Sequence, residues 1–98
     1  DVLKVGELES GSFVMRELAL IKVKVKDSKE RSDIINFVDV FRGRIIDVST
    51  DSLTVEITGT PDKIDAFLNL MKSFGILELA RTGITALARG AKSIKIDQ

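Results

Sequence analysis

The stretch from Arg16 to Val25, RELALIKVKV, constrains the fold of this chain more than any other. Successive side chains of a β-strand point to opposite faces, so every second residue shares a face. One face is apolar throughout and consists of Ala19, Ile21, Val23 and Val25. The opposite face begins with Leu18 and Leu20 and continues with Lys22 and Lys24. This pattern predicts a central strand whose apolar face lies beneath helices and whose other face is partly open.

Leu18 and Leu20 are therefore candidates for a contact surface at the apolar end of that second face. Two explanations of these leucines stay open at the level of the sequence. A partner can cover them, or a loop of the same chain can, because domains commonly carry small apolar clusters beside the main core.

Two helices are predicted from capping residues and from apolar residues at helical spacing. Asp27 is suited to cap the first helix, Ser28–Arg42, and Glu30 stands where it would complete a capping box. Gly43 is expected to end this helix by adopting a positive φ. Thr60 is predicted to cap the second helix. The second apolar stripe consists of Ile64, Phe67, Leu68, Met71 and Phe74.

Three short segments complete the predicted sheet, namely Arg44–Thr50, Leu53–Thr58 and Ile76–Arg81, and the first two form a hairpin. Thr82–Ala91 is interpreted as a short turn of helix. The order β-α-β-β-α-β predicts an α+β, ferredoxin-like (split βαβ) fold. Such a fold has a four-stranded antiparallel sheet, the first and third strands in the middle, and two helices on one face. Its helix-free face is the usual surface for partners or dimerisation.

Composition excludes several classes of function. Fifteen basic and fifteen acidic residues give a net charge of zero, which argues against nucleic acid and anionic membranes as partners. The chain has no Cys, His, Tyr or Trp, and its carboxylates are scattered, so we predict no catalytic, cofactor-binding or metal site. No apolar run approaches the ~18 residues of a membrane span, and the cytoplasm is the expected compartment.

Arginines supply the remaining candidates for an interface. Arg42 and Arg44 flank Gly43, an arrangement typical either of an anion clamp or of cations that a helix carboxyl end favours electrostatically. The predicted strand order places Arg81 near Arg16 and Glu17 on the neighbouring strand. Two roles stay open for these residues, a surface ion pair worth under ~1 kcal/mol or a contribution to an interface.

The segment that follows the last predicted strand carries two arginines beside glycines. Arg81, Thr82 and Gly83 are followed by Arg89, and this combination suits recognition of a carboxylate or of a partner's backbone. A purely structural role for these residues stays equally open.

Four runs of the sequence together resemble one family, the small regulatory subunit of acetolactate synthase (acetohydroxyacid synthase). The runs are DVLKVGEL, RELALIKV, FRGRIIDVSTDSLTVEITGTPDKIDAFL and ILELARTGITALARG. The family pattern is an ACT domain that binds the feedback amino acid, followed by a second, ferredoxin-like domain. The resemblance implies that residues 1–12 are the end of the upstream ACT domain with its linker. Residues 13–98 would then form the ferredoxin-like C-terminal domain.

The same resemblance implies a regulatory function without catalysis. The expected partners are a second copy, in a dimer formed through the sheet face, and the catalytic subunit of the synthase in branched-chain amino-acid biosynthesis. Thiamine diphosphate, magnesium and FAD would belong to that catalytic subunit. The alternative is an ACT-like amino-acid sensor in which Arg81 or Arg42 grips a carboxylate. A third hypothesis, an acylphosphatase-like hydrolase, lacks support because the loop after the first strand, Lys26-Asp27-Ser28, has no glycine.

Overall fold

The computed structural model describes residues 12–91. The predicted upstream segment, residues 1–12, lies outside the described residues except for its last position. The helices and strands follow the order β1 (Phe13–Lys24), α1 (Ser28–Val40), β2 (Arg44–Val48), β3 (Ser52–Gly59), α2 (Pro61–Met71), β4 (Ile76–Arg81) and β5 (Thr85–Ala88).

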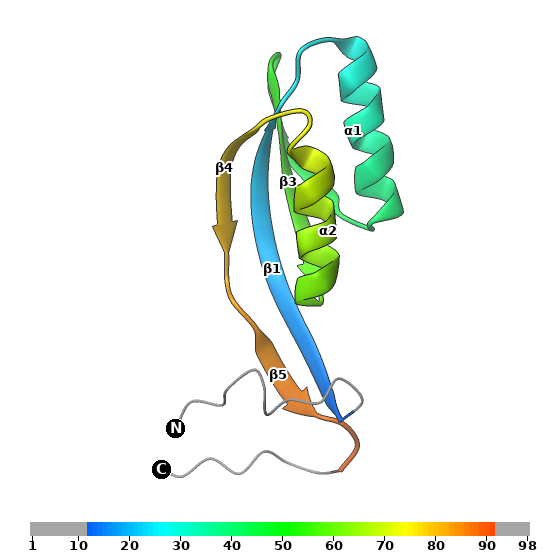
Figure 1. The fold of residues 1–98 in the computed structure, drawn as a ribbon, viewed down its shortest axis with the longest axis vertical. Helices are drawn as coiled ribbons and strands as arrows, with labels where there is room; N and C mark the ends of the chain where they lie inside the picture. The colour runs from blue at the N-terminus through cyan, green and yellow to red at the C-terminus, as the bar shows by residue number, and fades with distance from the viewer. Residues whose placement is uncertain (1–11, 92–98) are drawn as a thin grey trace.

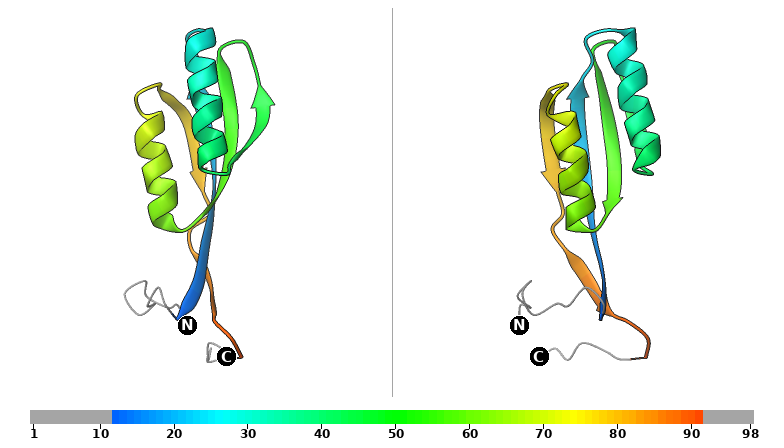
Figure 2. Two further views of the ribbon diagram at one scale, coloured as in Figure 1. Left: turned by 90° about the vertical axis from the view of Figure 1, so that its right-hand side faces the viewer. Right: turned by 45° about the vertical axis from the view of Figure 1, so that its right-hand side comes forward.

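The main sheet has the strand order β2-β3-β1-β4, and all neighbouring strands in it are antiparallel. Both helices cover the same face of this sheet (Figures 1 and 2). The ferredoxin-like prediction is thereby confirmed, including the central positions of β1 and β3. The 12-residue strand β1 is the axis of the molecule, because it pairs with three other strands.

The core lies between the helices and the central strands. Ala19, Ile21 and Val23 are fully buried, as their alternation predicts. Three residues of β3 (Leu53, Val55 and Ile57) are also buried, and so are residues of α1 and α2 (Ile34, Val38, Ile64, Phe67, Leu68 and Met71). Burying such side chains stabilises the fold by about 1.5–3 kcal/mol each before the cost of ordering the chain.

Both helices begin at the predicted caps. The Asp27 carboxylate accepts a hydrogen bond from the Glu30 amide at 2.9 Å. The Glu30 side chain accepts in return from the amide of Lys26 at 3.0 Å, one residue earlier than a standard capping box. The Thr60 hydroxyl accepts from the Lys63 amide at 3.3 Å, and α2 starts directly after it. Side-chain oxygens therefore satisfy amides that the first helical turns leave unpaired.

The end of α1 differs from the prediction. The helix stops at Val40, and Arg42, not Gly43, adopts the positive φ, at 57°. The amide of Gly43 donates to the Val38 carbonyl at 2.8 Å and the amide of Arg42 donates to the Asp39 carbonyl at 3.1 Å. This pair of bonds is a Schellman motif with arginine at the left-handed position. Gly43 does not end the helix through its φ, but its lack of a side chain allows close packing.

That close packing is visible around the α-carbon of Gly43. A β-carbon there would lie 3.1 Å from the carbonyl oxygen of Glu56 and 3.3 Å from a methyl group of Val38. The glycine therefore allows the chain to pass from α1 into β2 against the neighbouring strand β3.

The segment after β4 also differs from the prediction. Thr85–Ala88 forms β5, not a turn of helix, and it pairs antiparallel with Phe13–Arg16 of β1. This first part of β1 extends beyond the helices and beyond β3, whose pairing with β1 begins at Glu17 (Figure 1). Its backbone amides and carbonyls need partners, and β5 supplies them.

Candidate functional site

The face of the sheet opposite the helices is the candidate site for association. Leu18 is half-buried and Leu20 is 38% exposed, and no other segment within residues 12–91 lies over this face (Figure 2). The explanation in which a loop of the same chain covers both leucines is therefore not supported by the described part of the chain. Residues across the sheet from Leu20 are small or polar, with Ala80 on β4 and Glu56 on β3.

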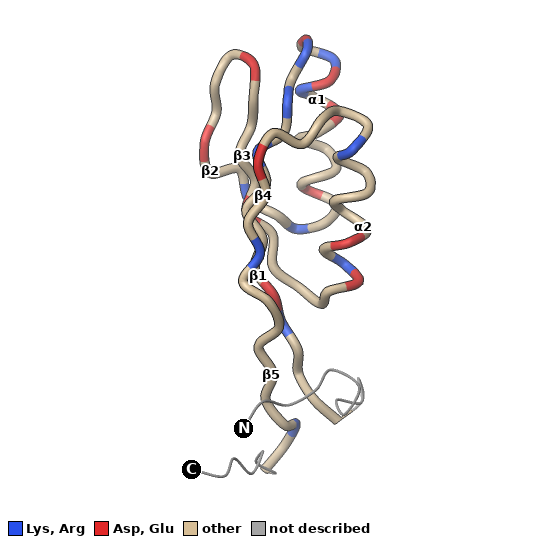
Figure 3. Tube along the Cα trace, turned by 60° about the vertical axis from the view of Figure 1, so that its left-hand side comes forward, with Lys and Arg blue, Asp and Glu red and all other residues tan. Residues whose placement is uncertain are grey.

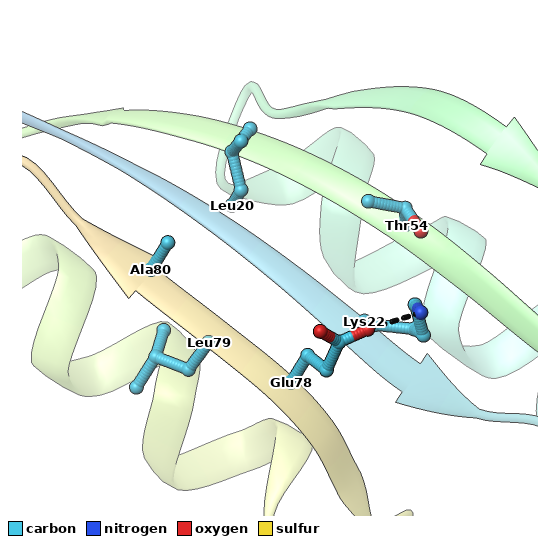
Figure 4. Close-up of a pocket in the computed structure, with 6 residues that line it drawn as sticks. All are labelled: Leu20, Lys22, Thr54, Glu78, Leu79 and Ala80. Carbon is cyan, nitrogen blue, oxygen red and sulfur yellow. Dashed lines mark hydrogen bonds and ion pairs between the residues drawn. The ribbon is translucent and has the colours of Figure 1, made fainter.

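A shallow depression forms around Leu20 on this face (Figure 4). It is lined by Leu20, Lys22, Thr54, Glu78, Leu79 and Ala80, which come from β1, β3 and β4. The ammonium of Lys22 donates to the carboxylate of Glu78 within it. This hydrogen bond raises the pKa of Lys22 and lowers the pKa of Glu78. One side of the depression is therefore apolar, and the other side carries the ion pair between Lys22 and Glu78.

A second ion pair spans the far side of the same face. Arg44 on β2 approaches Glu56 on β3 at 4.0 Å, and these two residues are directly opposite in the sheet register. Arg44 is largely exposed. The open face therefore carries both signs of charge around its apolar centre.

The arm formed by β5 and the first part of β1 continues the apolar stripe. Val14 lies opposite Leu87, and Leu87 is 71% exposed. Directly opposite residues of an antiparallel pair share a face, so Val14 and Leu87 lie on the face of Leu18 and Leu20. A two-stranded ribbon is only marginally stable alone in water. Association that buries the exposed leucine would therefore stabilise this arm.

Arg81 lies on the helix-covered side of the sheet rather than on the open face. Its guanidinium donates two hydrogen bonds to the carboxylate of Glu17, at 2.6 and 3.0 Å, and one to Asp65 on α2 at 2.8 Å. Glu17 is only 6% exposed, so the predicted pair between Arg81 and Glu17 exists but is not a surface pair. The two carboxylates raise the pKa of Arg81, and the hydrogen bond from Arg81 lowers the pKa of Glu17.

Thr82 and Gly83 extend the same connection between β4 and β1. The Thr82 hydroxyl accepts from the Leu18 amide and the Thr82 amide donates to the Leu18 carbonyl, both at 3.0 Å. The Gly83 amide donates to Glu17 at 3.2 Å. Arg81, Thr82 and Gly83 therefore have partners within the chain itself.

The other three arginines that the sequence analysis named, Arg42, Arg44 and Arg89, do not form a common site. Arg42 and Arg44 point to different places, since Arg42 lines a hollow beside α2 whereas Arg44 pairs with Glu56 on the open face. Arg89 lies just beyond β5, where its amide donates to the carbonyl of Ser12. The sequence analysis missed Glu78 and Ala80 as members of the open face. Their alternation in ILELAR could have identified them once β4 was placed beside β1.

The described residues offer little for other chemistries. No group of three or more carboxylate, His or Cys side chains within residues 12–91 could hold a metal ion. Neither helix in the described part has the length and hydropathy needed to cross a bilayer. Fold and surface together define a ferredoxin-like α+β domain with an open sheet face of mixed apolar and charged character.

Comparison with known proteins places this domain in a family. The family model described as the small subunit of acetolactate synthase matches residues 16–90, so the chain belongs to the family of acetolactate synthase small subunits. The chain is similar to the probable acetolactate synthase small subunit of Methanothermobacter thermautotrophicus, with 55% identity over 96% of this chain and 56% of that protein. The acetolactate synthase small subunit of Bacillus subtilis shows 49% identity over 94% of this chain and 53% of that protein.

A solved structure is similar as well. The crystal structure of the acetolactate synthase small subunit from Thermotoga maritima superposes with a TM-score of 0.77 and 43% sequence identity, over 85% of this chain and 50% of that chain. The chain therefore spans about half the length of the relatives that it matches.

Proposed function

We propose that this chain is a regulatory, non-catalytic domain of acetolactate synthase that associates with a second copy through the open face of its sheet. In this proposal the paired domains contribute to binding and activating the catalytic subunit, in the cytoplasm and in branched-chain amino-acid biosynthesis. Thiamine diphosphate, magnesium and FAD belong to the catalytic subunit. The observation that carries the proposal is the uncovered apolar centre of the sheet, formed by Leu18, Leu20 and Ala80.

The charges on the open face favour a second copy as the occupant. In a two-fold symmetric interface each surface meets its own copy, so it must be self-complementary. Lys22 with Glu78, and Arg44 with Glu56, place ion pairs of both signs around the apolar centre. A partner of strong single charge would leave half of these groups beside like charges.

The interface is tested by replacing Leu20 with glutamate. We expect Leu20→Glu to convert a dimer into a monomer in sedimentation, because a carboxylate would be buried against apolar surface in the complex. Leu70→Glu is the matched control, since Leu70 on α2 is 37% exposed against 38% for Leu20 but lies in the helix layer. A dimer that persists in Leu20→Glu, or that Leu70→Glu breaks equally, would show that the interface lies elsewhere.

The regulatory part of the proposal is tested with the catalytic subunit. Titration of the full protein into the catalytic subunit should raise the rate of acetolactate formation, and Leu20→Glu should need a higher concentration for the same effect. A folded protein that neither binds the catalytic subunit nor changes its rate would contradict this part.

The alternative function, an amino-acid sensor, is less well supported by the contacts of Arg81. Its guanidinium is already engaged by two carboxylates of the same chain, Glu17 and Asp65. We therefore expect calorimetric titration of residues 12–91 with valine, leucine or isoleucine to give no binding heat. Saturable binding that Arg81→Lys abolishes would favour the sensor instead.

A further inference from the structure

A hollow beside the start of α2 gathers three basic side chains, two from different elements and one from the connection after α1. It is lined by Arg16 of β1, Arg42 at the end of α1, and Lys63 of α2, together with Thr58, Gly59 and Thr60. These residues lie up to 47 positions apart in the sequence, from position 16 to position 63. Their convergence is therefore a product of the fold rather than of a basic run.

The ammonium of one cation, Lys63, is held in place by its surroundings. The ammonium of Lys63 donates to the carbonyl of Thr58 at 2.9 Å, and the side chain crosses directly over Gly59. A β-carbon on Gly59 would come within 2.5 Å of the Lys63 side chain. The backbone of Arg42 is held by the hydrogen bonds of the Schellman motif that ends α1.

The positive charges of the hollow are not neutralised by any carboxylate within residues 12–91. None of the three cations forms an ion pair with a carboxylate among the residues that the structure describes, whereas Arg44 and Arg81 both do. Asp62 lies on the first turn of α2 and is exposed, but it does not line the hollow. Figure 3 shows charged residues of both signs spread along the trace, whereas the residues that line the hollow include three cations and, within residues 12–91, no carboxylate.

The donors of the hollow are side chains rather than the amino end of α2. Pro61 has no amide hydrogen, and the amide of Lys63 is already bound by the Thr60 hydroxyl. Arginine offers a planar fork of N–H donors and lysine a compact charge, the combination that suits a tetrahedral oxyanion with several oxygens. Like charges that converge also repel each other, and an anion of two or more charges relieves this repulsion.

We propose that Arg16, Arg42 and Lys63 form a binding site for a phosphate-type oxyanion, either free phosphate or the phosphate group of a small metabolite. The site lies apart from the depression around Leu20, with which it shares no lining residue. Occupancy would tie the end of α1 to the start of α2 and to β1, and would stabilise the folded chain by linkage.

The test is titration of the full protein with inorganic phosphate and with pyrophosphate in a buffer without sulfate. Titration with chloride at equal ionic strength is the control. Calorimetry should show saturable binding, and the unfolding temperature should rise with phosphate but not with chloride. Arg42→Gln and Lys63→Gln should each weaken affinity about tenfold, which corresponds to about 1.4 kcal/mol. Pyrophosphate that binds more tightly than phosphate would support a phosphorylated metabolite as the source.

Arg44→Gln is the matched control, because it removes the same charge two residues away but outside the hollow. It should change affinity less than twofold. Gly59→Ala should weaken binding as well, because its methyl group displaces the Lys63 side chain while leaving all three charges in place. Phosphate that binds no better than chloride, or affinity that falls equally in Arg42→Gln and Arg44→Gln, would overturn the proposal. Binding only to an acidic protein partner would overturn it too.

Discussion

At the scale of single residues, Arg42 occupies a backbone conformation that suits glycine better than arginine. Its φ of 57° places the side chain close to its own backbone, which costs a non-glycine residue about 1–2 kcal/mol. Arg42→Gly should therefore stabilise the fold by about 0.5–1 kcal/mol, after the extra entropy of glycine in the unfolded chain is subtracted. Urea unfolding measures this change. Affinity for phosphate should fall in the same variant, so that stability and binding move in opposite directions.

Arg44→Gly provides the comparison for that prediction. Arg44 lies in β2, where glycine weakens a strand, so this variant should lose stability instead. If both variants change stability in the same direction, the left-handed position is not the source of the effect.

Glu17 is the residue whose titration matters most for stability. Its pKa lies below the ordinary value of 4.5, chiefly because Arg81 donates to its carboxylate. A lowered pKa in the folded chain means that the carboxylate stabilises the fold above pH 4.5 and that this stabilisation is lost as the pH falls through the folded pKa. Glu17→Gln should thus cost about 2 kcal/mol at neutral pH and much less in strong acid.

Urea titrations at neutral and strongly acid pH measure the difference between Glu17→Gln and the unchanged protein. Asp65→Asn removes the more exposed partner of Arg81 and should cost under about 1 kcal/mol. A cost for Glu17→Gln that is equal at both pH values would mean that the charge of the carboxylate contributes nothing.

At the scale of elements, β5 and the first part of β1 form an arm that extends beyond both helices of residues 12–91 (Figure 1). Ala86→Pro should remove the pairing of β5 with β1 but leave the body folded, because the core does not include β5. Hydrogen exchange should show lost protection at residues 13–16 and retained protection at residues 19–23.

Ala19→Pro is the same substitution in the central part of β1. Ala19 is fully buried and pairs with both β3 and β4, so proline there should unfold the body, with a cost of about 3 kcal/mol or more. Global unfolding of Ala86→Pro as well would show that the arm and the body form one cooperative unit.

At the scale of the whole molecule, the proposed dimer predicts that stability depends on protein concentration. The unfolding temperature should rise with concentration, because association through the open face stabilises the folded state. It should not rise in Leu20→Glu. Ile21→Glu, one residue further on, should unfold the chain at any concentration, because Ile21 is fully buried and a lone carboxylate there costs several kcal/mol.

Features that depend on local chemistry and on periodicity could be predicted from the sequence alone. The alternation from Ala19 to Val25 indicated the buried face, and Asp27 and Thr60 indicated where both helices begin. The right-handedness of the crossovers then placed β1 and β3 at the centre of the sheet. These inferences succeed because side-chain direction and capping bonds are set within a few residues.

Features that depend on contacts between distant segments became visible only in the folded chain. Thr85–Ala88 is a strand because the free edge of β1 lies beside it, which no local pattern in TGITALARG shows. Arg81 bonds to Glu17 at a separation of 64 residues. A β-carbon on Gly43 would lie 3.1 Å from the carbonyl oxygen of Glu56 on β3, so the need for glycine at this position comes from a distant segment. Arg16, Arg42 and Lys63 likewise meet only in the folded chain. The stretch from Arg16 to Val25 predicted a sheet with an open face, and the fold determined which charges surround that face.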